Sequence, residues 1–171
     1  MTQEHELPGE NDFFTTEEIY EIAALVNEKL AGVSYHYWVN KASQEVFEVL
    51  DWITLKFDSG NEVTFTGGLE SDGIKLVKPD FEADRKRLEI EFEGKVTIES
   101  RDASKHKLWK ECIGLELTPS LVKYEGKMLN DSLVLKFPDA DALIIFLGLE
   151  GLEVDYFEDE TTEHIDLKQH N

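Results

Sequence analysis

The sequence predicts an α+β protein that is predominantly antiparallel β, with one N-terminal helix followed by about 10–11 strands. Three observations predict this class: one helical run near the N-terminus, period-two alternation of apolar residues through most of the remaining chain, and an internal repeat. Two similar β units would meet as a sandwich, a curved sheet or a flattened barrel, and the sequence leaves these three arrangements open. A single domain over residues 1–171 is expected for a chain of this length.

A capping box marks the start of the predicted helix. Thr15 is suited to the N-cap position, with Glu18 three residues later, and apolar residues recur at helical spacing as far as Leu30. Gly32 would supply the left-handed residue that ends the helix. A helix is therefore expected within residues 15–32, after a mobile acidic leader at residues 1–14.

The internal repeat relates residues 51–76 to residues 131–154. At an offset of 80, with residues 71 and 72 skipped, eight of the 24 aligned pairs are identical. The alternating residues that precede each block extend the two predicted β units to 33–78 and 113–157. We interpret the repeat as a duplication, which predicts architecture but not chemistry.

The segment between the two units, residues 79–112, is expected to contain a connecting hairpin. Leu88, Ile90 and Phe92 alternate with glutamates, as in a strand with one solvated face. A Gly-Lys turn and a second short alternating run follow them.

The formal net charge of -20 is concentrated at the chain ends. Residues 1–20 hold six acids and no Lys or Arg, and residues 150–171 hold eight acids and one Lys, so the ends carry 13 of the 20 negative charges. Residues 158–171 are expected to form an acidic, solvated tail. This charge repels nucleic-acid phosphate and anionic lipid, so the sequence predicts neither nucleic acid nor membrane as a partner. A basic protein is the partner that the charge favours.

The lone cysteine and the apolar runs indicate a cytoplasmic protein. Cys112 has no partner for an internal disulfide and is expected to be a small buried hydrophobe. The longest apolar run, residues 142–147, is far below the roughly 20 residues that span a bilayer. The first residues lack the apolar core of a secretory signal. A monomer or a homodimer is expected.

Acids and histidines supply the candidates for catalysis. Asp51 and Asp131 occupy equivalent places in the repeat and would form a carboxylate pair if both faced inward, although Asp131 lies beside a turn, where capping of the backbone is favoured. His36 lies on a predicted strand among aromatic residues. The sequence has no metal-ligand spacing, nucleophile elbow or phosphate-binding glycine loop, so no catalytic residue, metal or cofactor is predicted.

Two groups of residues are candidates for binding. The first would line a ligand pocket between the two repeats and comprises Tyr35, His36, Tyr37, Trp38 and Trp52. The second would bind an anion or an acidic partner, or pair with neighbouring glutamates, and comprises Arg85, Arg87, Arg101, Lys105 and Lys107.

The leading functional hypothesis is a non-catalytic, acidic protein-binding module, for example an inhibitor or immunity-type protein that covers a basic partner. The alternative is a small-ligand-binding β protein with a pocket between the repeats. A hydrolase-type enzyme is the third hypothesis.

Overall fold

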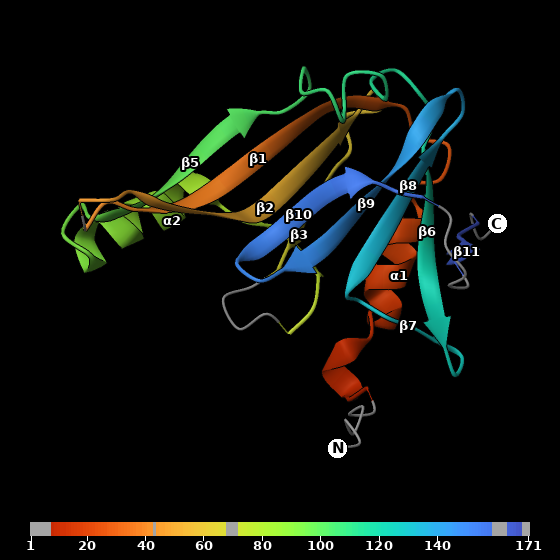
Figure 1. Cartoon of the computed structure of the whole chain (residues 1–171), viewed down its shortest axis with the longest axis horizontal. Helices are drawn as coiled ribbons and strands as arrows, with labels where there is room; N and C mark the ends of the chain where they lie inside the picture. The colour runs from red at the N-terminus through yellow and green to blue at the C-terminus, as the bar shows by residue number, and fades with distance from the viewer. Residues whose placement is uncertain (1–7, 43, 68–71, 159–163, 169–171) are drawn as a thin grey trace.

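Two antiparallel sheets face each other around one hydrophobic core (Figure 1). The structure is a computed structural model, and it describes residues 8–42, 44–67, 72–158 and 164–168. The two sheets do not join into a closed barrel. The predicted α+β, antiparallel fold class is confirmed, with a two-sheet arrangement.

The first sheet has the strand order β4-β3-β2-β1-β5. Its strands are β1 (Leu30–Asn40), β2 (Phe47–Phe57), β3 (Glu62–Thr66), β4 (Lys75–Val77) and β5 (Val96–Asp102). The second sheet has the order β10-β9-β8-β6-β11, with β7 paired to β6. Its strands are β6 (Thr118–Tyr124), β7 (Lys127–Met128), β8 (Ser132–Phe137), β9 (Ala140–Gly148), β10 (Gly151–Tyr156) and β11 (His164–Asp166).

The strand registers of the two sheets follow the offset of the sequence repeat. Thr54 of β2 lies opposite Thr64 of β3, and Val134 of β8 lies opposite Ile144 of β9, an offset of 80 in both strands. The next pairs are Phe65 with Leu76 and Ile145 with Val154, so the offset falls to 78 in the outermost strand. This decrease of two in the offset matches residues 71 and 72, which the alignment skips.

The strand predicted at residues 113–117 is wrong. Residues 113 and 114 form a turn, Glu116 makes only an isolated antiparallel bridge with Lys29, and β6 begins at Thr118. Ser34 of β1 lies opposite Thr54 and Ser120 of β6 lies opposite Val134, so the strand equivalent to β1 is offset by 86 residues and not by 80. The preceding segment is a loop whose apolar residues are buried in the core or packed against it, and their alternation resembled that of a strand.

The N-terminal helix is shorter than predicted. α1 spans Thr16–Ala23, with the expected capping box at Thr15, and turns then lead into β1. Asn27 has a φ of 67°, which breaks the helical path, and Gly32 lies within β1 and does not end the helix. Residues that continued the apolar stripe still reach the core from these turns.

A second helix replaces part of the predicted connecting hairpin. α2 spans Phe81–Glu91 and is capped by Asp80, whose carboxylate accepts a hydrogen bond from the backbone N–H of Ala83 at 3.1 Å. Its stripe against the first sheet runs through Phe81, Arg85 and Leu88 at helical spacing. Arginine in this stripe concealed the helical period, while exposed Ile90 gave a false strand period.

Both chain ends are more ordered than predicted where the structure describes them. The leader holds a short 3-10 helix, η1 (Glu10–Asp12), and Phe14 is buried with its backbone N–H bonded to the carbonyl of Met128. The predicted tail contributes β11, which pairs with β6. Residues 1–7, 159–163 and 169–171 lie outside the described part.

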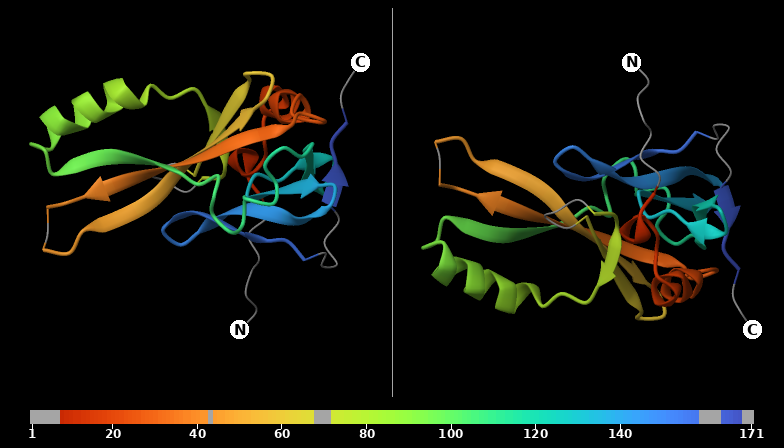
Figure 2. Two further views of the ribbon diagram at one scale, coloured as in Figure 1. Left: turned by 90° about the horizontal axis from the view of Figure 1, so that it is seen from above. Right: turned by 90° about the horizontal axis from the view of Figure 1, so that it is seen from below.

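The first sheet extends beyond the second as an arm (Figures 1 and 2). Figure 2 shows α2 on one face of this sheet and the second sheet on the other. The main core lies between the sheets, and a small cluster lies beneath α2, formed by Leu88, Val96 and Ile98 with Trp38, Trp52 and Phe81 packed on it. Neither helix of the described residues is long and apolar enough to span a bilayer.

Candidate functional site

The five aromatic and histidine candidates divide between the two faces of the first sheet. His36, Trp38 and Trp52 lie on the α2 side, where His36 stacks on Phe81 with ring centroids 3.9 Å apart. Tyr35 packs on the main core on the opposite side. They therefore do not line one pocket between the repeats.

Tyr35 has a structural role at the edge of the core. Its hydroxyl accepts a hydrogen bond from Nε1 of the fully buried Trp109 at 2.5 Å, and burial raises the pKa of Tyr35 to about 12. The ring of Tyr37 lies under the guanidinium of Arg101, 4.3 Å from its centroid.

The basic candidates do not form a single patch. Arg85 binds the α2 side of β5, whereas Arg101 is on the opposite face, where it binds Glu48 and Glu99 at 2.7 Å each. Arg87 pairs with Asp84 on the exposed surface of α2. Lys105 and Lys107 lie in the loop after β5.

A row of polar side chains crosses the first sheet on its α2 side. Nη2 of Arg85 donates to Oγ of Ser100 at 2.6 Å, and Ser100 lies 2.6 Å from Nδ1 of His36. Nε2 of His36 lies 3.0 Å from Oγ1 of Thr54, which lies 2.8 Å from Oγ1 of Thr64. The row, hereafter the polar row, joins one helix and four neighbouring strands.

The Arg85 cation orders the protons of the polar row. Arginine can only donate, so the Ser100 oxygen accepts from it, and we assign each further proton to point away from this charge. Ser100 then donates to Nδ1 of His36, Nε2–H donates to Thr54, and Thr54 donates to Thr64. Burial, together with the charges of Arg85 and Lys56, lowers the pKa of His36 to about 4, which keeps the imidazole neutral.

Three central positions of the equivalent row in the second sheet are aliphatic, whereas His164 lies opposite Val122 as Ser100 lies opposite His36. By strand register, Val122 corresponds to His36, Val134 to Thr54 and Ile144 to Thr64. The same fold is thus built with aliphatic side chains at these positions, and the polar row is not required by the architecture.

A groove of about 440 Å³ opens beside the polar row. His36, Thr54 and Thr64 line it together with Lys56 and Lys78. The segment that leads into α2 forms its other wall. A neutral imidazole, hydroxyls and two lysines suit hydrogen bonding to a ligand better than proton abstraction, because a histidine of such low pKa is a weak base.

The two aspartates proposed as a carboxylate pair lie in different surroundings. Asp51 is buried, and burial raises its pKa, although a hydrogen bond with Thr66 opposes the shift. Asp131 is exposed just before β8. Within the described ranges, no group of three or more His, Cys, Asp or Glu side chains is placed to hold a metal ion.

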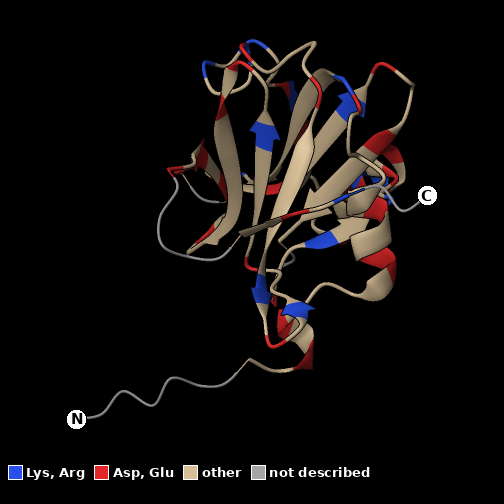
Figure 3. Ribbon diagram, turned by 90° about the vertical axis from the view of Figure 1, so that its right-hand side faces the viewer, with Lys and Arg blue, Asp and Glu red and all other residues tan. Residues whose placement is uncertain are grey.

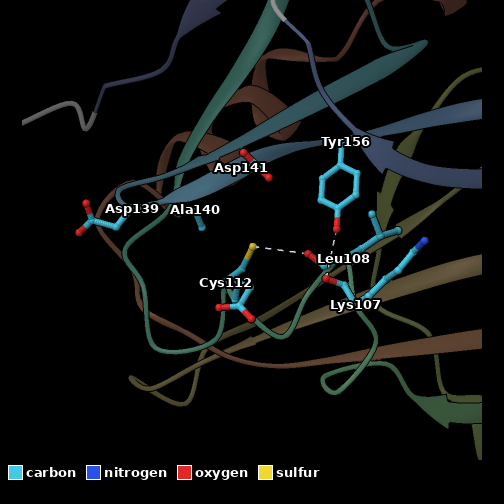
Figure 4. Close-up of a pocket in the computed structure, with 8 residues that line it drawn as sticks. Lys107, Leu108, Cys112, Asp139, Ala140, Asp141 and Tyr156 are labelled. Atoms are coloured by element: carbon cyan, nitrogen blue, oxygen red, sulfur yellow. Dashed lines mark hydrogen bonds between the residues drawn. The ribbon is translucent and has the colours of Figure 1, made fainter.

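Cys112 is buried, as predicted, beside another pocket of about 440 Å³ (Figure 4). Its thiol donates to the carbonyl of Leu108 at 3.7 Å, and Asp139 and Asp141 line the same pocket from the start of β9 and the turn before it. Burial and then the charges of Glu111 and Asp141 raise the pKa of Cys112 to about 11. The thiol is therefore protonated at neutral pH and unsuited to nucleophilic attack.

Exposed apolar side chains gather at the free end of the arm, hereafter the distal tip. Ile90 is 83% exposed, Val46 57%, Phe47 45% and Phe92 41%. A hydrogen bond from the Lys41 backbone N–H to the Lys95 carbonyl, at 2.7 Å, ties the turn between β1 and β2 to the turn between α2 and β5. Both pairs of apolar residues flank these joined turns.

Glutamates lie beside the apolar side chains of the distal tip, whose two joined turns also hold Lys41 and Lys95. Glu89 and Glu91 occupy the last turn of α2, which holds no basic residue, and Glu93 follows the helix with a φ of 53°. Glutamates at a helix C-terminus oppose the helix dipole and destabilise the helix. The opposite end of the molecule also carries acidic positions, among them those of α1, together with lysines or arginines on neighbouring strands and turns (Figure 3).

Comparison of the chain with protein-family models, curated proteins and solved structures finds no match. Function is therefore inferred from the chain's own residues.

Sequence reasoning singled out only His36 and Arg85 of the polar row. Thr54, Thr64 and Ser100 share a face with His36, but their meeting depends on strand order and on a register shift after His36. The distal tip was missed because α2 was read as a strand.

Proposed function

We propose that the protein is a non-catalytic binding module that covers a basic partner protein, as an inhibitor or immunity-type protein does. The observation that carries this proposal is the distal tip, where four exposed apolar side chains lie next to glutamates. Apolar anchors with a charged rim are typical of protein interfaces.

The local costs of the distal tip support a binding role. Ile90 gains little from burial in the monomer and Phe47 only part of what full burial would give, and the glutamates at the end of α2 weaken that helix. Residues that break local rules without benefit to the fold are typical of functional surfaces. The partner is expected to present an apolar patch surrounded by Lys or Arg, which the net charge of -20 also attracts over longer range.

Two related proposals concern where in the cell the protein acts and how many copies of the chain assemble. We propose that the protein acts in the cytoplasm, consistent with a buried, unpaired Cys112, and that it works as a monomer or homodimer without nucleic acid or membrane. The matching registers of the two sheets support an origin by duplication.

Affinity capture from the source cell's lysate tests the function. Three tagged proteins are compared at low and moderate salt: the wild type, the double variant Phe47→Ser/Ile90→Ser, and the control Tyr20→Ser/Tyr156→Ser, which removes two exposed aromatic rings outside the distal tip. A stoichiometric basic protein should be recovered by the wild type and the control, lost with the tip variant, and released as salt rises. Equal recovery by the tip variant and the control would refute the assignment of the distal tip.

A further inference from the structure

The groove beside the polar row lies near the N-terminal end of α2, away from the distal tip. Its floor holds Ser34, Thr54 and Thr64 from three neighbouring strands, and Lys78 stands on the segment before the helix. With a volume of about 440 Å³ it falls within the range of small-molecule sites.

Thr64 supplies a donor at the end of the polar row. Its side chain is 6% exposed, and its hydroxyl lies 2.8 Å from Oγ1 of Thr54, from which it accepts in the proton arrangement assigned above. In the described part of the chain, Thr54 is the only hydrogen-bond partner of this hydroxyl. Since the protons of the row point away from Arg85, that of Thr64 is directed to an acceptor beyond the row.

Two lysines give the groove a positive character. Lys56 and Lys78 both line it, and neither forms an ion pair with a described residue. Glu62 also lines the groove, which leaves one net positive charge in a protein of net charge -20. A local excess of cations and hydroxyl donors is suited to an anionic ligand.

The second sheet shows that the fold does not need the two threonine hydroxyls that line the groove. Val134 and Ile144 take the places of Thr54 and Thr64. Aliphatic side chains at these positions satisfy the architecture, so the hydroxyls of the first sheet are available for another role.

We propose that this groove binds a small molecule through a carboxylate or phosphate group, which lies near Lys56 and Lys78 and accepts a hydrogen bond from Thr64. Neutral His36 holds Thr54 in place, and through it Thr64. The site does not depend on the proposed partner at the distal tip.

Titration by heteronuclear NMR, with inorganic phosphate and with acetate as probes, tests the proposal. Ionic strength is held constant with NaCl at pH 7.5. Saturable shifts are expected at Thr54, Thr64 and Lys56, and none at Val134 and Ile144, which serve as an internal control. A response to phosphate alone, to acetate alone or to both supports the site and identifies the acidic group. Absence of saturable shifts with either anion, or equal shifts at the control positions, would overturn the proposal.

Three variants sharpen this test. Thr64→Val keeps the side-chain shape and resembles Ile144 of the second sheet, so it should fold and bind more weakly. Lys56→Gln should weaken binding about tenfold, whereas Glu62→Gln should strengthen it because a repulsive charge is removed. The spectrum of each variant without anion confirms its fold. If all three bound the responding anion as the wild type does, the groove would not be its site.

Discussion

His36 on β1 and Val122 on β6 occupy equivalent positions in the two sheets, and each lies opposite the edge strand of its sheet. His36 pairs with Ser100 of β5, and Val122 pairs with His164 of β11. In the first sheet the imidazole connects Arg85 to two threonines, whereas in the second an aliphatic side chain fills the same place. The two units thus share registers and differ in chemistry.

Replacement of His36 by valine, which copies Val122, should alter the pH dependence of stability. The folded-state pKa of His36 is about 4 and its unfolded value about 6.5, so as pH falls from 6.5 towards 4 the unfolded state binds a proton that the folded state does not. The wild type should lose roughly 2–3 kcal/mol through this group over that window, and His36→Val should not.

Urea unfolding of both proteins at pH 7.5 and pH 4 measures the difference. The raised pKa of Asp51 opposes this trend, but it is present in both proteins and cancels in the comparison. Parallel losses in the wild type and the variant would show that His36 is not held neutral by the fold.

Gly151 lies where the two sheets approach each other closely, so replacing it with any residue that has a side chain should destabilise the protein. Gly151 has a φ of 136°, and an added Cβ would lie 2.6 Å from the carbonyl oxygen of Leu50 in the other sheet. Gly94 has a φ of 78° with open space around it, so Gly94→Ala carries only backbone strain, about 1 kcal/mol. Gly151→Ala should destabilise by at least about 2 kcal/mol more, as measured by urea denaturation. Equal losses would indicate that the sheets separate easily at this contact.

The cores of the two units should respond alike to truncation. Leu55 of β2 and Leu135 of β8 are equivalent in register and both fully buried in the main core. Each Leu→Ala change should reduce the free energy of unfolding by about 2–5 kcal/mol in one cooperative transition. Two separate transitions in either variant, seen by fluorescence and circular dichroism, would mean that the sheets fold independently.

Neutralising the glutamates of the distal tip should stabilise the protein. Glu89, Glu91 and Glu93 stand at the end of α2, where negative charge opposes the helix dipole. The triple change to Gln should raise the midpoint of thermal unfolding by about 2 °C at low salt, and less at high salt. Glu17→Gln, at the opposite, favourable end of a helix, is the control and should lower it. A lower midpoint for the triple variant would argue against the charge conflict.

Much of the architecture was predictable because the alternation of apolar residues within each strand and the repeat at an offset of 80 residues can both be read directly from the sequence. Ile53, Leu55 and Phe57 alternate on the core face as expected. α2 was not predicted, since Arg85 interrupts its apolar stripe and binds the polar row instead. The loop around Trp109 was not predicted either, because burial without regular structure leaves no period.

The candidate site was less accessible to sequence reasoning. The polar row joins Arg85, Ser100, His36 and Thr54, which are far apart in the chain, and the pairing depends on the position of β5 beside β1. The distal tip could be predicted only if α2 were known to be a helix that ends beside the turn between β1 and β2. Only the excess of acidic charge was evident from composition.

The central claim, that the distal tip binds a basic partner, is tested most directly by the affinity of the triple glutamine variant. With the captured partner purified, the dissociation constants of the wild type and of Glu89→Gln/Glu91→Gln/Glu93→Gln are measured by isothermal titration calorimetry at low and moderate salt. The triple variant should be more stable than the wild type but bind the partner about tenfold or more weakly, with a reduced salt dependence. Unchanged affinity in this variant would contradict the claim.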